Sequence, residues 1–297
     1  MDKIHYTYCP ACKGTAIQPV LTVEDYTVSH ETFAVWHCNS CTLRFTQDIP
    51  AASAIGKYYQ SENYISHTNT SKGLVNRLYH IVRSYTLGSK KKLIQSVSSR
   101  NTGTLLDVGA GVGAFAAYMR QQGWQVTGLE PDAETRKRAQ EQNRIALQDT
   151  ADLFKLPAAN FDVITMWHVL EHVHQLDEYL IQLKALLKPG GVLLIAVPNY
   201  TSHDAAHYQQ YWAAYDVPRH LYHFSPASVR TLLQKQGLSL KNIKPMWFDS
   251  FYVSLLSEKY KTGKASIVKG FWRGFVSNLK AAGNKEKCSS LIYMITK

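Results

Sequence analysis

The stretch Thr104-Leu-Leu-Asp107-Val-Gly109-Ala-Gly111-Val-Gly113 decides the fold of this chain. An apolar run ends at Asp107, three glycines follow at alternate positions, and a helical pattern runs from 114 to 122. A buried strand, a tight turn and a helix N-terminus let backbone approach a nucleotide-like ligand, because glycine adds no side chain. By itself the loop also fits a plain strand-to-helix turn, or the dinucleotide fingerprint that Gly109, Gly111 and Ala114 satisfy.

Strand and helix patterns alternate after this loop. The further strands are expected at 124–129, 145–147, 161–166, 192–197, 238–243 and 289–296, with helices at 133–143, 176–187 and from Ser225-Pro226 to Gly237. Strands separated by helices predict a parallel, doubly wound α/β sheet. Glu130 ends the second strand, 21 residues after Gly109. An acidic side chain there can accept hydrogen bonds from both hydroxyls of a ribose.

The N-terminal region carries two C-x-x-C pairs, Cys9 with Cys12 and Cys38 with Cys41, separated by 25 residues. Each pair can place two thiolates on one ion, so together they predict a tetrahedral zinc-ribbon site with short strands between the pairs. Four protein ligands leave no open position, so the expected Zn²⁺ is structural. Two disulfides or a redox pair are the alternatives, and the fifth cysteine, Cys288, is expected in the core.

The segment from 51 to 98 is predicted to connect the ribbon to the α/β domain. It begins tyrosine-rich over 51–66, turns polar like a linker over 67–73, and shows helical spacing from 74 to 97 with a break near Gly88. We therefore expect a zinc-ribbon domain over 1–50, a helical bridge over 51–98 and the α/β domain over 99–297.

Bulk composition limits the function classes. The chain has 297 residues, 45% of them hydrophobic, and a net charge of +11 with a pI near 9.3. Such a surface attracts polyanions or phosphorylated small molecules, although a merely basic enzyme has the same charge. No apolar run is long enough for a membrane span, and Met1 to Tyr8 is polar, so we expect a cytoplasmic protein.

Five motifs in order resemble the class I S-adenosylmethionine-dependent methyltransferases. They are the glycine loop, Gly128-Leu-Glu130, Phe161-Asp-Val-Ile164, His168-Val-Leu-Glu-His172-Val and Leu187-Lys-Pro-Gly-Gly191. The resemblance covers about Leu93 to Lys297, implies a Rossmann-like sheet of seven strands, and favours a methyltransferase over a dehydrogenase. The cysteine pairs and the run from Tyr215 to Phe224 look like a bacterial subgroup associated with sugar or cell-surface polysaccharide tailoring.

The resemblance also implies which residues bind S-adenosylmethionine and its product S-adenosylhomocysteine. The methionine and ribose parts are assigned to Asp107, Gly109, Ala110, Gly111 and Gly113, and the ribose hydroxyls to Glu130 and Pro131. The adenine is assigned to Ala151 and Asp152, and the sulfonium to Trp167 and His168. At Ala151 and Asp152 the sequence departs from the Gly-Asp pair usual in the family.

An alcohol acceptor also needs a base, and histidine suits that role near neutral pH. The catalytic candidates are His172, His220 and His223. His172 can instead pack in the turn after the fourth strand, and the other two can make hydrogen bonds within an ordered loop. Arg219 can hold a phosphate or carboxylate, or can pair with Asp216.

Residues 248–287 combine clustered aromatic side chains with lysines. We interpret this insertion as a helical cap that keeps water out of the acceptor pocket. A dimer surface or a helix resting on acidic lipid is the alternative. A homodimer is therefore one of the assemblies that we consider for this chain.

The predicted function is methyl transfer to a small-molecule acceptor. A sugar, a polysaccharide precursor or a phosphorylated compound is the suggested acceptor. The alternatives are an RNA methyltransferase using the basic surface, a non-catalytic cofactor-binding scaffold, and a nicotinamide enzyme. A stable nucleic-acid partner is not expected, because acidic residues interrupt the ribbon and no RNA motif is present.

Overall fold

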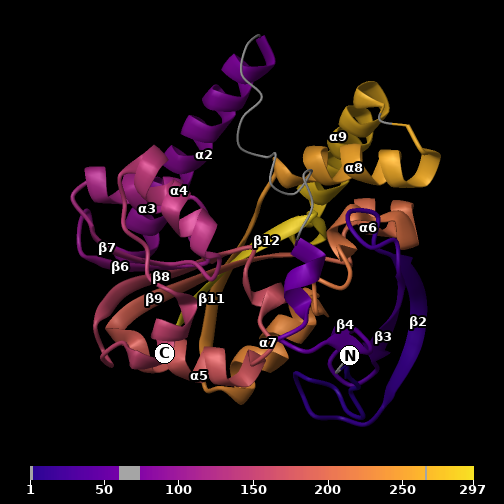
Figure 1. Ribbon diagram of the computed structural model, residues 1–297, viewed down its shortest axis with the longest axis horizontal. Helices are drawn as coiled ribbons and strands as arrows, with labels where there is room; N and C mark the ends of the chain where they lie inside the picture. The colour runs from indigo at the N-terminus through magenta and orange to yellow at the C-terminus, as the bar shows by residue number, and fades with distance from the viewer. Residues whose placement is uncertain (1–2, 60–73, 265) are drawn as a thin grey trace. The chain divides into compact units, whose positions relative to one another are not determined.

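The computed structural model describes residues 3–59, 74–264 and 266–297, and over 74–84 it describes only the helical backbone (Figure 1). The chain divides into two compact units that interleave along the sequence. Unit 1 comprises Met1–Ile65, Leu170–Asp177 and Ala196–Tyr293, and unit 2 comprises Ser66–Val169, Glu178–Ile195 and Met294–Lys297. The predicted linker at 67–73 lies outside the described residues, and the three consecutive domains remain a prediction.

The central sheet confirms the predicted α/β fold. Its order is β11-β12-β9-β8-β6-β7, from strands β6 (Thr104–Val108), β7 (Gln125–Leu129), β8 (Phe161–Trp167), β9 (Leu187–Pro198), β11 (Ser239–Pro245) and β12 (Ser290–Thr296). Strand β6 pairs in parallel with both neighbours, so Asp107 lies beside Gly128 on β7 and Thr165 on β8. The residues of β9 and β12 are divided between the two units.

The strand predicted at 145–147 is reduced to one parallel bridge between Leu129 and Gln148. Hydrogen bonds in both directions support it, since the Gln148 N–H donates to Gly128 and the Glu130 N–H donates to Gln148, each at 2.9 Å. The segment thus extends the sheet beyond β7 by two backbone contacts. Six strands and this bridge stand where seven strands are expected.

Helices cover both faces of the sheet in unit 2. They are α2 (Leu74–Ser98), α3 (Ala114–Gln121), α4 (Ala133–Asn143), most of α5 (Leu176–Leu186), and the short 3-10 helix η3 (Thr150–Lys155). Figure 1 shows α3 and α4 above the strands and α5 below them. Ala116 and Ala117 of α3 pack with Ala139 of α4 and with Ile145. Such small residues let the two helices lie close to the sheet.

The break predicted near Gly88 is wrong, because α2 runs without interruption from Leu74 to Ser98. A single glycine inside a helix costs about 1 kcal/mol relative to alanine, which is too little to end a helix of 25 residues. After Gly88 the helix continues with two buried apolar side chains, Leu93 and Ile94.

Unit 1 holds the N-terminal antiparallel strands. These are β1 (Lys3–Ile4) paired with β5 (Ile49–Pro50), and a sheet of order β10-β4-β3-β2 from β2 (Ile17–Glu24), β3 (Thr32–Cys38), β4 (Arg44–Thr46) and β10 (Tyr222–His223). The short strands predicted between the cysteine pairs are therefore confirmed. Strand β10 comes from far along the chain and pairs Tyr222 with Phe45 and His223 with Arg44. The cysteine region consequently shares its sheet with a later loop.

Helices of 3 to 17 residues complete unit 1. They are η1 (Ile55–Tyr59), η4 (Leu170–His172), α6 (His203–Tyr208), η5 (Gln209–Tyr211), η6 (Ala213–Tyr215), α7 (Pro226–Lys235), α8 (Asp249–Thr262), α9 (Ile267–Gly283) and η7 (Lys285–Lys287). As predicted, Ser225 caps α7 ahead of Pro226.

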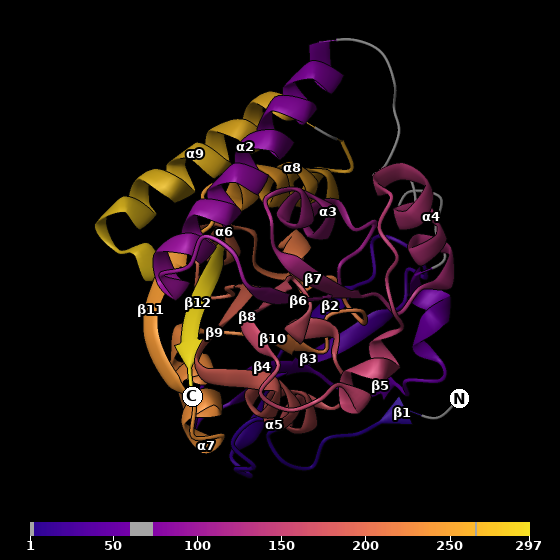
Figure 2. The same cartoon turned by 90° about the vertical axis from the view of Figure 1, so that its left-hand side faces the viewer.

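Cys288 is fully buried, which confirms it as a core residue. Helices α8 and α9 lie side by side (Figures 1 and 2). Over the described residues, no helix is long and apolar enough to span a bilayer.

Candidate active site

The glycine loop between β6 and α3 adopts the backbone that its sequence predicts. Gly109, Gly111 and Gly113 have φ of 71°, 54° and 72°, a region that strongly favours glycine. A Cβ on Gly109 would lie 2.4 Å from Val169, and a Cβ on Gly113 would lie 2.5 Å from Ile145. A Cβ on Gly111 would meet nothing within 4 Å. Two glycines therefore serve packing, while Gly111 borders open space that a ligand can fill.

Glu130 joins this loop to the end of β7. Its Oε2 accepts a hydrogen bond of 2.9 Å from the Gly111 N–H, and its Oε1 accepts one of 3.2 Å from the Asp132 N–H. A carboxylate has about four acceptor positions, so two remain for ligand hydroxyls. Burial raises the pKa of Glu130. Arg136 donates to the carbonyls of Glu130 and Pro131, both at 2.7 Å, which holds this turn in place.

Asp107 is the buried acid of the site, at 2% exposure. The Thr165 hydroxyl donates to its Oδ1 at 2.7 Å. Burial raises the pKa of Asp107 to about 6, against the lowering effects of Thr165 and Lys90, while Glu130 raises it further. At neutral pH the group is mainly a carboxylate, so Asp107 and Glu130 together favour a cationic ligand.

An aromatic pair lies where β8 ends. Trp167 and Phe115 meet edge to face with ring centroids 5.7 Å apart, and Lys90 Nζ lies 4.1 Å from the Trp167 centroid and 5.4 Å from that of Phe115. Such cation–π contacts hold the lysine close to the site. His168, the next residue, has φ of 58°, which is uncommon outside glycine. In the sequence Lys90 is only the first of three consecutive lysines, and nothing local connects α2 with β8.

The two residues assigned to adenine lie in η3. Asp149 caps this helix by accepting from the Ala151 N–H at 2.9 Å, and Lys155 pairs with Asp152 at 2.8 Å. Arg136 reaches Asp149 at 2.9 Å and so links η3 to the turn after β7. All four segments assigned to cofactor binding thus belong to unit 2, and their individual roles remain predictions.

His172 and His220 come together in unit 1, with ring centroids 4.6 Å apart. Nδ1 of His172 lies 3.0 Å from the Arg219 carbonyl oxygen, and Nδ1 of His220 lies 2.8 Å from the Ala214 carbonyl oxygen. Because a carbonyl only accepts, each Nδ1 donates to its carbonyl, and Nε2 is the second nitrogen of each ring, which for His220 lies 4.0 Å from an Asp216 oxygen. Burial, and then the charge of His220, lowers the pKa of His172 to about 4, so its ring is neutral at pH 7.

Glu171 completes this group. One ligand atom from each of Glu171, His172 and His220 lies within 4.8 Å of the others. The Leu221 N–H donates to the Glu171 carbonyl at 2.8 Å, which ties η4 to the loop that carries His220. A carboxylate with two imidazoles can accept protons or bind a divalent cation.

Arg219 is buried at 1% exposure and pairs with two carboxylates. Its Nη2 lies 2.7 Å from Asp216 and 2.8 Å from Asp25, and its Nε lies 3.1 Å from Asp216. Burial alone would raise the pKa of each aspartate, but the guanidinium lowers both below the usual value. Of the two roles expected for Arg219, the pairing with Asp216 is the one present.

His223, the third candidate base, is buried at 3% exposure in β10. Its Nε2 lies 3.1 Å from the Thr46 hydroxyl, and its ring packs edge to face on Tyr215 with centroids 4.9 Å apart. Burial lowers its pKa well below the usual value, with His220 and Arg44 adding to the effect. These contacts bind the loop to β4.

The four N-terminal cysteines gather as predicted. The Sγ atoms of Cys9 and Cys41 lie 3.5 Å apart, as do those of Cys12 and Cys38, and all four lie within 4.8 Å of one another. Zinc at about 2.3 Å from each sulfur would place tetrahedral ligands about 3.8 Å apart, so the cluster fits such an ion.

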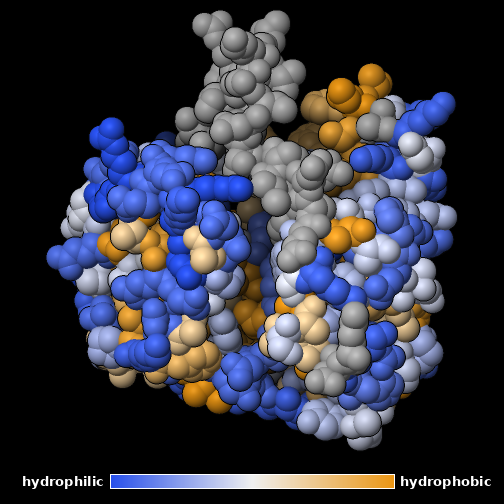
Figure 3. Space-filling model, in the orientation of Figure 1, coloured by the Kyte–Doolittle hydropathy of each residue, from blue (hydrophilic) through white to orange (hydrophobic). Residues whose placement is uncertain are grey.

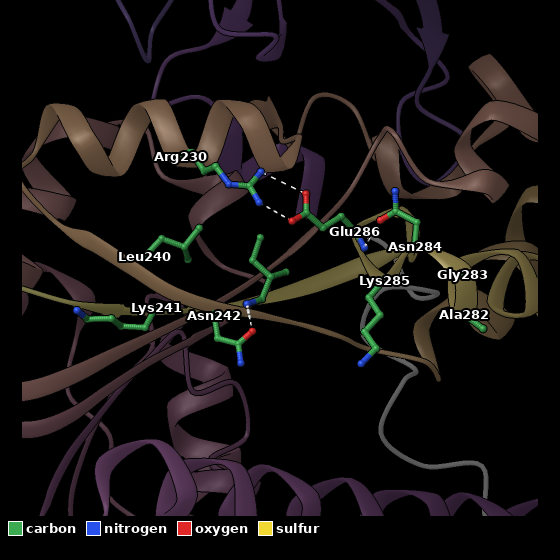
Figure 4. A pocket seen from close by; sticks show the side chains of 10 residues that line it. Arg230, Leu240, Lys241, Asn242, Ala282, Gly283, Asn284, Lys285 and Glu286 are labelled. Atoms are coloured by element: carbon green, nitrogen blue, oxygen red, sulfur yellow. Dashed lines mark hydrogen bonds and ion pairs between the residues drawn. The ribbon is translucent and has the colours of Figure 1, made fainter.

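A separate hollow of about 690 Å³ lies over β11 and η7 (Figure 4). Figure 4 shows Arg230 and Glu286 facing each other across it, with one oxygen–nitrogen distance of 3.2 Å. Lys241, Asn242 and Lys285 also line it. It contains none of the site residues predicted from the sequence.

Comparison with known proteins places residues 82–242 in a sequence family described as "Methyltransferase domain". The ubiquinone biosynthesis O-methyltransferase of Rickettsia prowazekii is 26% identical over 205 residues, which cover 62% of this chain and 78% of that protein. The enzyme of that name from Xanthomonas axonopodis pv. citri is 29% identical over 158 residues, covering 49% of this chain and 66% of that protein.

Solved structures show the same fold. A putative sarcosine dimethylglycine methyltransferase from Galdieria sulphuraria superposes with a TM-score of 0.50 at 17% identity, covering 74% of this chain and 86% of that one. The family match begins within α2 and ends in β11, so the cysteine cluster lies outside it.

Proposed function

Because this chain belongs to the methyltransferase domain family and is an S-adenosylmethionine-dependent enzyme, we propose that it methylates a hydroxyl of a small-molecule acceptor. The relatives named as O-methyltransferases support oxygen as the acceptor atom. S-adenosylmethionine supplies a methyl group on an electrophilic sulfonium, so the protein has chiefly to position the reactants and exclude water.

The observation that carries this proposal is the open space at Gly111 beside the Glu130 carboxylate. In the proposed complex, Glu130 accepts hydrogen bonds from the ribose hydroxyls, and Asp107 provides negative charge for the cationic methionine end. Ala151 and Asp152 contact the adenine, and Trp167 with His168 lies beside the sulfur. Lys90 keeps the Trp167 ring in place through the contact of 4.1 Å.

Calorimetry tests this assignment on folded, metal-replete protein. S-adenosylmethionine and S-adenosylhomocysteine should both bind, and Glu130→Gln should weaken binding about tenfold or more, because a charged hydrogen-bond acceptor is lost. Glu134→Gln, which changes an exposed acid in the first turn of α4, is the matched control and should bind normally. No heat with either nucleoside, or binding of NADH instead, would refute the assignment.

For the proton we propose His220 as the base, since its Nδ1 is held by the Ala214 carbonyl, which leaves Nε2, 4.0 Å from Asp216, as the nitrogen that takes the proton. His172 supports it from the neighbouring ring, and His223 orients the loop through Thr46. His220→Asn keeps a donor toward Ala214 but loses the base. It should lower kcat by about 100-fold or more while S-adenosylhomocysteine binding is retained.

His30→Asn is the control for this substitution, because His30 is an exposed turn residue with φ of 56°, which asparagine tolerates. Its kcat should equal that of the wild type. Unchanged kcat in His220→Asn would remove His220 as the base without affecting the cofactor assignment.

The acceptor itself is best sought by incubating the enzyme with labelled S-adenosylmethionine and a small-molecule extract. The expected product has gained the mass of one methylene on oxygen. The sugar or polysaccharide acceptor stays a prediction, since the names of the relatives lend it no support. Label in RNA rather than in small molecules would favour the alternative of an RNA methyltransferase.

We also propose that Cys9, Cys12, Cys38 and Cys41 hold one structural Zn²⁺. The sulfur distances of 3.5 Å support this, and both turns close in the same way. The Lys13 N–H donates to the Cys9 carbonyl at 2.9 Å, and the Thr42 N–H donates to that of Cys38 at 2.8 Å. Elemental analysis of purified protein should find one zinc per chain.

A further inference from the structure

Helix α9 exposes its large apolar side chains. Six of them are exposed by 44% to 80%: Ile267, Val268, Phe271, Trp272, Phe275 and Leu279. At about 100° per residue they fall within an arc of about 140° on the helix surface, so they form one continuous face. We call these six residues the apolar face of α9. In Figure 3, orange side chains gather at the upper right, over this hairpin of helices.

The opposite side of α9 is built from small residues. Gly270, Gly274, Ser277 and Ala281 are buried, and a Cβ on Gly270 or Gly274 would lie 2.7 Å from the backbone of Leu255 or Phe251 on α8. The helix therefore packs against α8 through its small residues. This is the reverse of an ordinary surface helix, whose large apolar residues face the core.

The exposed charge of the hairpin is strongly positive. Its exposed basic residues are Lys259, Lys261, Lys264, Lys269, Arg273 and Lys280. Between 249 and 283 the acids are Asp249, at the start of α8, and Glu258. Glu258 is buried and accepts a hydrogen bond of 3.0 Å from the Tyr208 hydroxyl. An apolar face bordered by positive charge is complementary to an anionic lipid surface.

We propose that α9 docks this protein on the surface of an anionic bilayer, with the helix axis in the plane of the interface. The apolar face enters the boundary between headgroups and acyl chains, where Trp272 is well suited to its amphipathic surroundings. Lys269, Arg273 and Lys280 lie about 60° to 100° beyond the edge of the apolar face at Trp272, and their positive charge attracts the anionic headgroups across the thickness of the helix, which is close to one Debye length.

A second copy of the chain fits this surface less well. A two-fold contact through the apolar face of α9 would bring together two hairpins that each carry six exposed basic residues. Like charges in such a contact are unfavourable, and no acid on the exposed surface of α9 offsets them. Lipid phosphate provides the opposite charge over the whole face.

Vesicle sedimentation with the full-length protein tests the proposal. The wild type should sediment with phosphatidylcholine vesicles that contain phosphatidylglycerol, should do so weakly with phosphatidylcholine alone, and should be released as ionic strength rises. Replacing Phe271, Trp272 and Phe275 by serine should abolish binding. The paired change Lys269→Glu and Arg273→Glu should weaken it by roughly fivefold or more per residue.

Two matched variants serve as controls. Ile181→Ser removes an apolar side chain that is 56% exposed on α5, and Lys137→Glu reverses an exposed charge on α4. Both should bind vesicles like the wild type. The serine variant must keep its wild-type circular dichroism and S-adenosylhomocysteine binding, which separates lost docking from lost folding.

Three results would overturn the proposal. They are equal binding to neutral and anionic vesicles, binding that survives the serine substitutions, and a concentration-dependent dimer in ultracentrifugation that those substitutions abolish. The last result would assign the face to a second copy. None of these outcomes bears on cofactor binding, because the residues assigned to the cofactor belong to unit 2 and α9 to unit 1.

Discussion

At the scale of single residues, the three glycines of the loop all have positive φ, but their surroundings differ. Gly109 and Gly113 are tightly enclosed, by Val169 and Ile145, whereas Gly111 borders open space. Substitution should therefore separate folding from ligand binding. The distinction follows from where a methyl group would point, since all three backbones are left-handed.

Gly111→Ala should fold, with a loss of about 1–2 kcal/mol of unfolding free energy from the left-handed backbone. Its affinity for S-adenosylhomocysteine should fall tenfold or more, because the methyl group occupies ligand space. Gly113→Ala adds a clash with Ile145 and should lose roughly 2–5 kcal/mol. Urea denaturation and calorimetry measure both effects. Wild-type affinity in Gly111→Ala would show that the ligand lies elsewhere.

Asp107 makes the stability of the ligand-free protein depend on pH. Its pKa is about 6 in the folded protein and 3.8 as an ordinary value, so folding favours the protonated form. The stabilisation is fully present only well below pH 3.8 and is lost as pH rises from there through 6. Relative to Asp107→Asn, the wild type should lose about 2.4 kcal/mol between pH 4 and pH 7.

Denaturation of both proteins across this range checks the sign. Thr165→Val removes the hydroxyl that lowers the pKa of Asp107, so its pH transition should move upward. A pH-independent difference between the wild type and Asp107→Asn would mean that Asp107 is solvated in solution.

At the scale of elements, the α8–α9 hairpin is held by close contact between the two helices at Gly270 and Gly274 and by one pair of aromatic rings. Phe251 and Phe271 stack with centroids 4.8 Å apart across it, and Ser277 donates to buried Asp204 at 2.9 Å. The insertion predicted at 248–287 is thus helical. Its role as a cap over the acceptor remains a prediction, and protection from limited proteolysis on cofactor binding would support it.

Gly274→Val should separate the two helices, because its first side-chain carbon would lie 2.7 Å from the Phe251 backbone. We expect a loss of about 1–3 kcal/mol and faster hydrogen exchange over 249–283. Gly283→Val is the matched control at the end of α9, where nothing lies within 4 Å of the added carbon. Equal exchange in the two variants would contradict this account of the packing.

At the scale of the whole chain, the cysteine region is continuous with the histidine loop of unit 1. Strand β4 follows Cys41 directly and pairs with β10, and Thr42 shares a hydrogen bond of 2.6 Å with Ser225. The Thr46 hydroxyl donates to the His220 carbonyl at 2.8 Å. Loss of the metal should therefore destabilise backbone structure well beyond residues 9–41.

Removing zinc with a chelator should speed hydrogen exchange over 213–225 as well as over the ribbon, because β10 loses its partner strand. Cys38→Ser should have the same effect, whereas Cys288→Ser, which changes the cysteine outside the cluster, should leave zinc content unchanged. If the increase in hydrogen exchange were confined to the ribbon, the metal site would belong to a domain that folds independently.

The sequence by itself determined the parts that are local. The strand, loop and helix around Gly109–Gly113 could be predicted because apolar run, glycine spacing and helical periodicity all occur within about twenty residues. The cysteine cluster followed from the geometry of C-x-x-C turns. The caps of α7 and the acid after β7 were local signals as well.

Only the tertiary structure decided which distant side chains meet. It placed Lys90 on Trp167, paired Arg219 with Asp25, brought His220 to His172, and added β10 to the N-terminal sheet. It also turned the large apolar residues of α9 outward, against their usual direction. Periodicity shows that a helix has an apolar face, but long-range packing selects what covers that face, since burial depends on every other element of the fold.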